Sequence, residues 1–330
     1  MNTANASPLT SSLPRATAAE AADHSHDHPH EHGHHPAPVK LQVVNLLAVV
    51  LPLAGLIAAM VMLWGHGFGW TELGLLVGFY LFTALGITVG YHRLFTHRAF
   101  DTYPAVKAVF AVLGSMALQG PLMLWVAWHR RHHQHSDDEG DPHSPHTHGY
   151  EGIKGTLVGL FHSHVGWMLY PTNWNYARYV GDLRKDKLLR RINDSFFLWV
   201  ALGLLAPAVL GGLITMTWTG ALLGFLWGGL VRLLLVHHVT WSVNSICHLW
   251  GAREFKSQDE SRNNIIVGVL GMGEGWHNTH HAFPTSARHG LSWWQVDVSY
   301  LVIKFLSWVG LAWNVKVPTQ QAIAAKRARA

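Results

Sequence analysis

Residues 41–64 read LQVVNLLAVVLPLAGLIAAMVMLW and contain no charged residue. At a rise of about 1.5 Å per residue, an apolar helix of this length crosses a hydrocarbon core of about 30 Å. Similar apolar runs follow at about residues 71–91, 195–217 and 219–240. Only 13% of the 330 residues are charged, about half of the roughly 25% that is typical of a soluble domain. These features predict an all-α integral membrane protein with four transmembrane helices.

The distribution of basic residues predicts how these helices are oriented. The connections Gly65–Trp70 and Met216–Gly220 contain no lysine or arginine, whereas Arg93–Arg191 and the region after Ala252 carry most of them. Lysine and arginine are enriched in cytoplasmic segments of membrane proteins. We therefore expect a multi-pass protein whose polar segments and both termini lie in the cytoplasm.

A fifth apolar stretch, Ala105–Trp128, is long enough to cross the membrane, but its composition does not suit a continuous transmembrane helix. It is interrupted by Lys107, Gly114, Gln119, Gly120 and Pro121. If it crossed, the histidine-rich segments on its two sides would lie on opposite faces of the membrane. We expect instead an interfacial or re-entrant helix pair against the cytoplasmic face, as part of a helical cap.

Composition divides the chain into three parts. Residues 1–40 carry seven histidines among small, acidic and proline residues, which predicts a disordered tail. Residues 41–318 contain the apolar runs and form the predicted membrane domain, and residues 319–330 form a predicted C-terminal tail. Cys247 is the only cysteine, which excludes an internal disulfide.

Three short histidine clusters stand at the ends of apolar stretches. They read His92-Arg-Leu-Phe-Thr-His97, His129-Arg-Arg-His-His133 and His277-Asn-Thr-His-His281. Imidazole is the commonest metal ligand in proteins. Eight such ligands exceed what one octahedral ion can use, so two metal ions are predicted. The ligand type does not identify the metal, because imidazole suits iron, zinc, copper and nickel alike.

The spacing within the clusters predicts how they sit on helices. In His-x-x-His-His the three histidines share one helical face, because residues three and four apart are neighbours on a helix surface. His92 and His97 are five residues apart and do not share a face of a continuous α-helix. We therefore expect one of them where a helix ends.

These stretches resemble the membrane fatty acyl desaturases, and among them the acyl-CoA Δ9 (stearoyl-CoA) desaturases. The resemblance extends from about residue 40 to about residue 310 and so covers the whole membrane domain. The matching motifs are, in chain order, Gly90-Tyr-His-Arg-Leu-Phe-Thr-His97, Trp128-His-Arg-Arg-His-His133, Asp141-Pro-His143, Ser163-His-Val-Gly-Trp167, Asn244-Ser-Ile-Cys-His248 and Gly273-Glu-Gly-Trp-His-Asn-Thr-His-His281.

The resemblance implies a centre of two iron ions that uses O2 as co-substrate and introduces a cis double bond, expected at Δ9, into a saturated acyl chain. It implies that Asn244, four residues before His248, holds one iron through a water molecule. The nine histidines that it implies as ligands are His92, His97, His129, His132, His133, His248, His277, His280 and His281.

The resemblance also implies partners. The substrate is a long-chain fatty acyl group carried as acyl-CoA or as acyl-lipid. In animal acyl-CoA desaturases an arginine and an aspartate that help hold CoA stand at the positions of Ala127 and Trp128, so the carrier stays open. We find no fused cytochrome b5-like segment, and therefore expect a separate electron donor of the ferredoxin, rubredoxin or cytochrome b5 type with a reductase. Membrane lipids are expected partners, and nucleic acid is not.

Further residues are candidates for the surroundings of the centre. Gln119, Trp125 and Trp241 are predicted to line the kinked apolar tunnel that the resemblance implies. Glu274, three residues before His277, is predicted to orient an imidazole from the second coordination shell. The acidic side chains that follow the second cluster are expected to form a solvated loop that ends a helix; they are Asp137, Asp138, Glu139 and Asp141.

Two other functions fit part of this pattern. A histidine-rich di-iron membrane hydroxylase uses similar chemistry and differs in its product, an alcohol instead of an alkene. A divalent-metal transporter is suggested by the histidine-rich tail. Transport ligands are expected within the spans near the bilayer midplane, whereas the three clusters stand outside the main apolar runs. The pattern therefore favours the enzyme.

Overall fold

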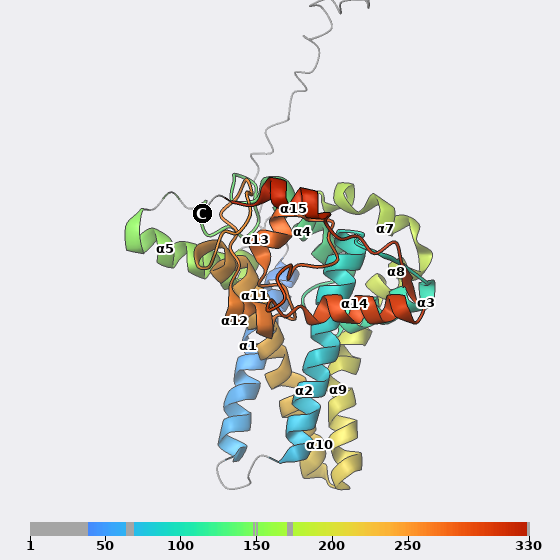
Figure 1. Ribbon diagram of the computed structural model, residues 1–330. Coiled ribbons are helices and arrows are strands. Elements are labelled where there is room, and N and C mark those ends of the chain that lie inside the picture. Colours follow the sequence, from blue (N-terminus) through green and yellow to red (C-terminus); the bar gives the residue numbers. More distant parts are fainter. Residues whose placement is uncertain (1–38, 64–68, 148, 150, 170–173, 329–330) are drawn as a thin grey trace, which may run out of the picture. The chain divides into compact units, whose positions relative to one another are not determined.

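The computed structural model describes residues 39–63, 69–147, 149, 151–169 and 174–328, and their regular structure is almost entirely helical (Figure 1). The predicted N-terminal tail, up to residue 38, lies outside the described residues. The elements are α1 (Val39–Leu63), α2 (Trp70–Leu85), η1 (Gly86–Thr96), β1 (Asp101–Thr102), α3 (Pro104–Ser115), α4 (Leu122–His135), α5 (Gly152–Phe161), η2 (His162–Gly166), α6 (Trp167–Leu169), η3 (Tyr176–Val180), α7 (Gly181–Lys185), α8 (Lys187–Asp194), α9 (Phe196–Thr215), α10 (Trp218–Gly224), η4 (Phe225–Val231), α11 (Arg232–Leu249), α12 (Ile265–Leu270), α13 (His277–Ala282), α14 (Val298–Trp308), β2 (Ala312–Trp313) and α15 (Gln320–Lys326).

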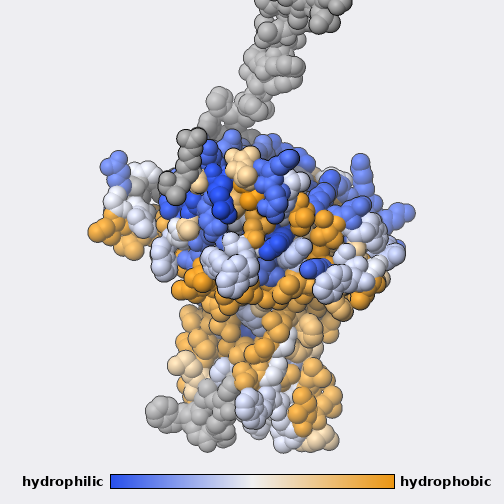
Figure 2. All heavy atoms as spheres, viewed as in Figure 1, coloured by the Kyte–Doolittle hydropathy of each residue, from blue (hydrophilic) through white to orange (hydrophobic). Residues whose placement is uncertain are grey.

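Four helical segments are long and apolar enough to cross a membrane, and they coincide with the four apolar runs of the sequence. The second segment joins α2 to η1, and the fourth joins α10, η4 and α11. On the face shown in Figure 2, hydrophobic side chains cover these helices and hydrophilic side chains gather over the remaining elements. The expected fold class, an all-α membrane protein, is confirmed. The segments are Val39–Met62, Trp70–Thr96, Phe196–Thr215 and Trp218–Leu249.

The second and fourth of these segments are longer than a membrane requires. They contain 27 and 32 residues, which corresponds to about 40 Å and about 48 Å of helix, against a hydrocarbon core of about 30 Å. Their C-terminal ends therefore extend into a cap formed by the shorter helices. His92 lies in the extension of the second segment and His248 in that of the fourth.

The stretch Ala105–Trp128 forms two helices, α3 and α4, and not one. The connection between them contains Leu118 and Gly120, whose positive φ angles of 54° and 99° turn the chain out of the helix. The buried guanidinium of Arg232 donates a hydrogen bond to the carbonyl oxygen of Met116 (2.9 Å) and so satisfies a carbonyl group left free at the break. Because α3 and α4 form a hairpin, the first and second histidine clusters lie at the same end of the helices.

The C-terminal third closes the cap. β2 pairs antiparallel with β1, with Trp313 opposite Asp101. α14 is amphipathic: Ile303 is fully buried in the core around η1, α3 and α4, and Phe305 is exposed. The last residues, expected as a tail, contain the short helix α15, and the ammonium group of Lys326 donates a hydrogen bond to the carbonyl oxygen of Ala282 (2.6 Å).

Candidate metal centre

The nine histidines named from the sequence converge at the base of the cap, where η1, α4, α11 and α13 meet. Their nitrogen atoms form two groups, and within each group these atoms lie within 4.8 Å of one another. The first histidine group consists of His92, His97, His129, His133 and His280. The second histidine group consists of His132, His248, His277 and His281.

A widened helix brings His92 and His97 together. Residues 86–96 form a π-helix, in which the backbone N–H of His97 donates to the carbonyl oxygen of His92, five residues earlier (3.1 Å). Residues five apart share a face in a π-helix, which is rare and concentrated at functional sites. The two rings are 4.8 Å apart, and His97 stands at the helix end as expected.

The two His-x-x-His-His motifs each contribute to both groups. On α4, His129 and His133 face the first group and His132 faces the second. On α13 the division is reversed, because His280 faces the first group and the other two histidines of the motif face the second. Both helices therefore lie along the boundary between the two groups, which the spacing alone does not reveal.

Distances between the nitrogen atoms test whether these groups suit metal ions. The Nε2 atoms of His92 and His280 are 3.1 Å apart, and those of His248 and His277 are 3.0 Å apart. At a metal–nitrogen distance of about 2.1 Å, adjacent ligands of an octahedral ion are about 3.0 Å apart. The Nε2 atom of His97 is buried and has no hydrogen-bond partner among the described residues. The side chains present therefore fit two metal ions.

Burial favours the neutral form of four imidazoles of the centre. Burial lowers the pKa of His129, His133, His277 and His280 well below the usual range for histidine, and neighbouring imidazoles lower it further. A neutral imidazole has a free lone pair, and a protonated one does not. For these four histidines the surroundings thus favour the protonation state that binds metal.

Carboxylates orient the histidines of the second group. The Nδ1 atom of His132 donates to Asp141 (2.9 Å), that of His248 to Asp137 (2.8 Å), and that of His281 to Asp259 (2.5 Å). Each of these hydrogen bonds leaves the Nε2 atom of the same ring directed at the second histidine group. Burial alone would raise the pKa of these carboxyl groups, but their imidazole partners outweigh burial and hold it below the usual range.

The expectation of a solvated acidic loop is therefore wrong for Asp137 and Asp141 and right for the exposed Asp138 and Glu139. The physical reason is that the loop folds back over α4, so that two of its carboxylates meet imidazoles from α4 and α11. Asp259 was missed by the sequence reasoning altogether. No spacing signal exists for it, because it lies far along the chain from most of the histidines and not on a shared helix.

Glu274 orients an imidazole, but it is not the imidazole of the nearby His277. Its carboxylate accepts a hydrogen bond from Nδ1 of His92 (2.5 Å) and forms an ion pair with the buried guanidinium of Arg93 (3.0 Å). Burial alone would raise the pKa of Glu274, but these two partners lower it below the usual range. The adjacent His289, which the sequence reasoning also missed, has its Nδ1 atom 3.2 Å from Nη2 of Arg93.

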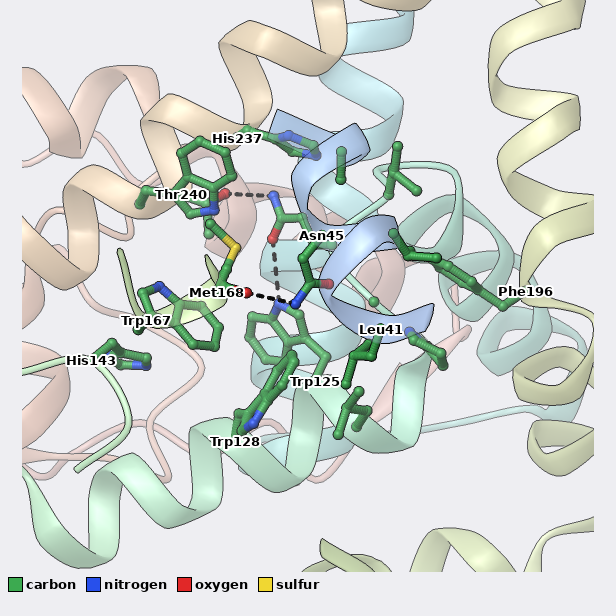
Figure 3. A pocket seen from close by; sticks show the side chains of 18 of the residues that line it. Leu41, Asn45, Trp125, Trp128, His143, Trp167, Met168, Phe196, His237 and Thr240 are labelled. Atoms are coloured by element: carbon green, nitrogen blue, oxygen red, sulfur yellow. Dashed lines mark hydrogen bonds between the residues drawn. The ribbon is translucent and has the colours of Figure 1, made fainter. Parts of the chain in front are cut away.

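An apolar cavity of about 400 Å³ lies beside the centre, lined by residues of α1, α4 and α11 (Figure 3). Gln119, Trp125 and Trp241, the candidate tunnel residues, all line it. The Nε2 atom of Gln119 donates a hydrogen bond to Oγ1 of Thr240 (2.9 Å), and its Oε1 accepts one from Nε1 of Trp125 (3.3 Å). The side chain of His129 forms part of the wall, so the cavity reaches the first histidine group.

A second, smaller cavity of about 50 Å³ continues beyond the first, with Tyr80 and Val239 in its wall. The two cavities share Trp125, His129, Thr240 and Asn244 as lining residues. Asn244 thus faces both cavities one helical turn before His248. Both cavities thus adjoin the first histidine group through His129, one of the residues that they share.

Four membrane-length helices, nine converging histidines and adjacent apolar cavities are features of a histidine-rich membrane enzyme. Comparison with known protein families identifies the family to which the chain belongs. The fatty acid desaturase model matches residues 68–298, and the chain belongs to the fatty acid desaturase family.

Three characterised relatives show the range of this similarity. The chain is 46% identical over 279 residues to the hex-5-enoyl-[acyl-carrier protein] acetylenase of Moorena producens, covering 84% of this chain and 87% of the relative. It is 39% identical over 263 residues to the sn-1 stearoyl-lipid 9-desaturase of Synechocystis, covering 78% and 76%. It is 38% identical over 241 residues to the icosanoyl-CoA 5-desaturase of Limnanthes douglasii, covering 72% and 62%. The chain is therefore an oxidoreductase of fatty acyl metabolism.

Proposed function

We propose that this chain is an O2-dependent fatty acyl desaturase, which introduces a cis double bond into a saturated acyl chain at a centre of two iron ions. One observation carries the proposal: His129 belongs to the first histidine group and also lines both apolar cavities. An acyl chain threaded through the cavities would pass directly beside the metal centre. Nine imidazoles suit iron, and we propose that Asn244, which lines both cavities, holds one ion through water.

Two bound iron ions would supply the activation of O2 that attack on an unactivated C–H bond requires. The reaction takes one hydrogen atom from each of two adjacent methylene carbons, and a carbon–carbon double bond forms between them. O2 accepts these two hydrogens with two further electrons and two protons and leaves as two water molecules. We propose that a separate carrier of the ferredoxin, rubredoxin or cytochrome b5 type, with its reductase, delivers the electrons.

The chain's own residues place the reacting methylene pair. The ring of Trp125 stacks on that of His129, with centroids 5.2 Å apart. Gln119 connects Trp125 to Thr240 across the cavity wall through its two hydrogen bonds. This arrangement holds the wall that the two cavities share, and a misplacement of about 1 Å can reduce a rate about 100-fold.

We propose Δ9 as the position of the double bond and acyl-lipid or acyl-CoA as the substrate. The 9-desaturase activity and lipid carrier in the name of the Synechocystis relative support this choice. We further propose that residues 41–318 form one desaturase domain with its centre on the cytoplasmic face. The absence of lysine and arginine from residues 216–220, at the far end of the spans, supports this orientation.

A second candidate function is conversion of an existing double bond into a triple bond. The 46% identity to an acetylenase supports it. The chemistry differs only in the carbon pair that loses hydrogen. The metal-transport alternative gains no support, because the histidine groups lie in the cap and not midway along the spans.

Expression in a desaturase-deficient host, with products identified by mass spectrometry, tests these proposals. A cis-9 alkene from a supplied saturated acyl chain supports the main proposal. An alkyne from hex-5-enoyl substrate supports the second candidate, and an alcohol indicates a hydroxylase. His132→Ala and His277→Ala should each abolish product while the protein still inserts into the membrane. Retained product in either variant would contradict the ligand assignment.

A further inference from the structure

The two histidine groups differ in the charge behind them. Three of the four histidines in the second group donate from Nδ1 to an aspartate. In the first group, within the part of the chain that the structure describes, only His92 has a carboxylate bonded to Nδ1. A carboxylate bonded to a metal-binding imidazole raises its basicity and fixes its orientation. The second group therefore has more imidazoles whose basicity and orientation are set by a carboxylate.

Compensating cations make the difference larger. Glu274, the carboxylate behind the first group, shares the guanidinium of Arg93 with Asp297, so its charge is partly neutralised. Among the described residues, Asp137, Asp141 and Asp259 form no ion pair with lysine or arginine. Their other partners are hydroxyl groups, backbone N–H groups and, for Asp141, the imidazole of His143 (3.7 Å).

Ligand number acts in the opposite direction. The first group offers five imidazoles and the second offers four. The first group has one additional neutral ligand, whereas the second group has two additional carboxylates. The single carboxylate behind the first group is also partly neutralised by Arg93. Loss of a single such carboxylate typically weakens metal binding by about 10- to 100-fold. The charge difference should therefore outweigh the ligand difference.

We propose that the two groups are unequal metal positions, and that the second histidine group binds a divalent ion more tightly than the first. Asp137, Asp141 and Asp259 are positioning residues that set this order, since they act through the imidazoles. The inference rests on the proposed function only in requiring that both groups bind metal. It also implies that the metal in the second group is the harder of the two to reduce, because uncompensated negative charge stabilises the higher oxidation state.

Titration of the purified full-length chain with Co²⁺ tests the proposal without reference to activity. After removal of metal by a chelator, absorbance and competition with a metal indicator report each binding step. The first equivalent should bind at least about 10-fold more tightly than the second. Asp141→Asn and Asp259→Asn should each weaken the first equivalent by about 10- to 100-fold. Glu274→Gln should weaken only the second.

Asp138→Asn is the matched control, because Asp138 lies in the same loop and its side chain is exposed. It should leave both steps unchanged. His97→Ala removes a ligand of the first group and should leave the affinity for the first equivalent of Co²⁺ unchanged. This variant tests the proposal even if an aspartate variant fails to fold. Two equal affinities, or a first equivalent weakened by Glu274→Gln, would overturn the inference while leaving the di-iron proposal standing. Protein that binds no metal would overturn both.

Discussion

At the scale of single residues, the centre depends on which nitrogen of each imidazole is free. Where Nδ1 donates to a carboxylate, as in His132, Nε2 keeps its lone pair and points at a metal position. Histidines without such a partner, such as His277, are held by the packing of their helix. The nine proposed ligands are thus similar in type but different in how firmly they are oriented.

Thr240 provides a residue-scale prediction. Thr240→Val removes the hydroxyl that accepts the hydrogen bond of Gln119 (2.9 Å) and loosens the wall between the two cavities. We expect a mixture of double-bond positions and a rate reduced by about 10- to 100-fold. Mass spectrometry of the products measures the mixture.

Ser242→Ala is the control for this variant. Ser242 lies on the same helix, but its hydroxyl donates to the carbonyl oxygen of His238 (2.7 Å) and lines neither cavity. Its products should be those of the parent chain. A single unchanged double-bond position in Thr240→Val would show that this hydrogen bond does not position the substrate.

At the scale of elements, the π-helix η1 must pack closely on α3 to hold the first cluster. A Cβ atom on Gly86 would lie 2.3 Å from the backbone nitrogen of Gly114. Because backbone atoms cannot move aside as a side chain can, Gly86→Ala should force the two helices apart and lower the free energy of unfolding by about 1–3 kcal/mol. Thermal unfolding in one detergent measures the change.

Gly74→Ala is the matched control on the preceding helix α2. A Cβ on Gly74 would meet no atom within 4 Å. Because alanine favours a helix by up to about 1 kcal/mol over glycine, this variant should be as stable as the parent or more so. Equal stability of the two variants would contradict the close packing of η1 on α3.

Asp182 joins α7 to α4, and its contribution to the stability of the fold should depend on pH. Its carboxylate accepts hydrogen bonds from Arg130 (2.8 Å) and Arg98 (2.5 Å). Partial burial alone would raise the pKa of Asp182, but the two guanidinium groups outweigh it and hold the pKa below its usual range. The stabilisation is therefore fully present above the unfolded pKa of about 3.9 and is lost as pH falls through the lower folded value.

Thermal unfolding at two pH values tests this linkage. Asp182→Asn should unfold at a lower temperature than the parent at pH 7, by a modest amount because the carboxylate is partly exposed. The difference should narrow below about pH 4. A difference that stays constant down to pH 3 would mean that the charge of Asp182 is not the cause.

At the scale of the whole molecule, the proposed orientation places the two ends of the spans on opposite sides of the membrane. Met216 is exposed at the turn between α9 and α10, and Lys256 is exposed in the cap. In a Cys247→Ala background, an impermeant maleimide should label Met216→Cys in sealed right-side-out vesicles. Lys256→Cys should be labelled only after the vesicles are opened. The reverse pattern would contradict a cytoplasmic cap.

The sequence by itself determined the class of the protein. Uncharged runs such as residues 41–64 are long enough to span a membrane, and length and hydropathy are local properties that need no knowledge of the fold. The histidine motifs likewise identified the family and indicated metal binding, because ligand type is carried by the residues themselves. The break in Ala105–Trp128 was also predictable, since glycine and proline act on the backbone where they stand.

Only the tertiary structure decided how those parts meet. It divided each His-x-x-His-His motif between two groups, placed Glu274 against His92, and brought Asp259 to His281. Such pairings join residues from different elements, so they depend on the angles and depths at which helices pack. Periodicity along one helix carries no information about these quantities, and this is why an acidic loop that reads as solvated in the sequence supports a metal centre in the fold.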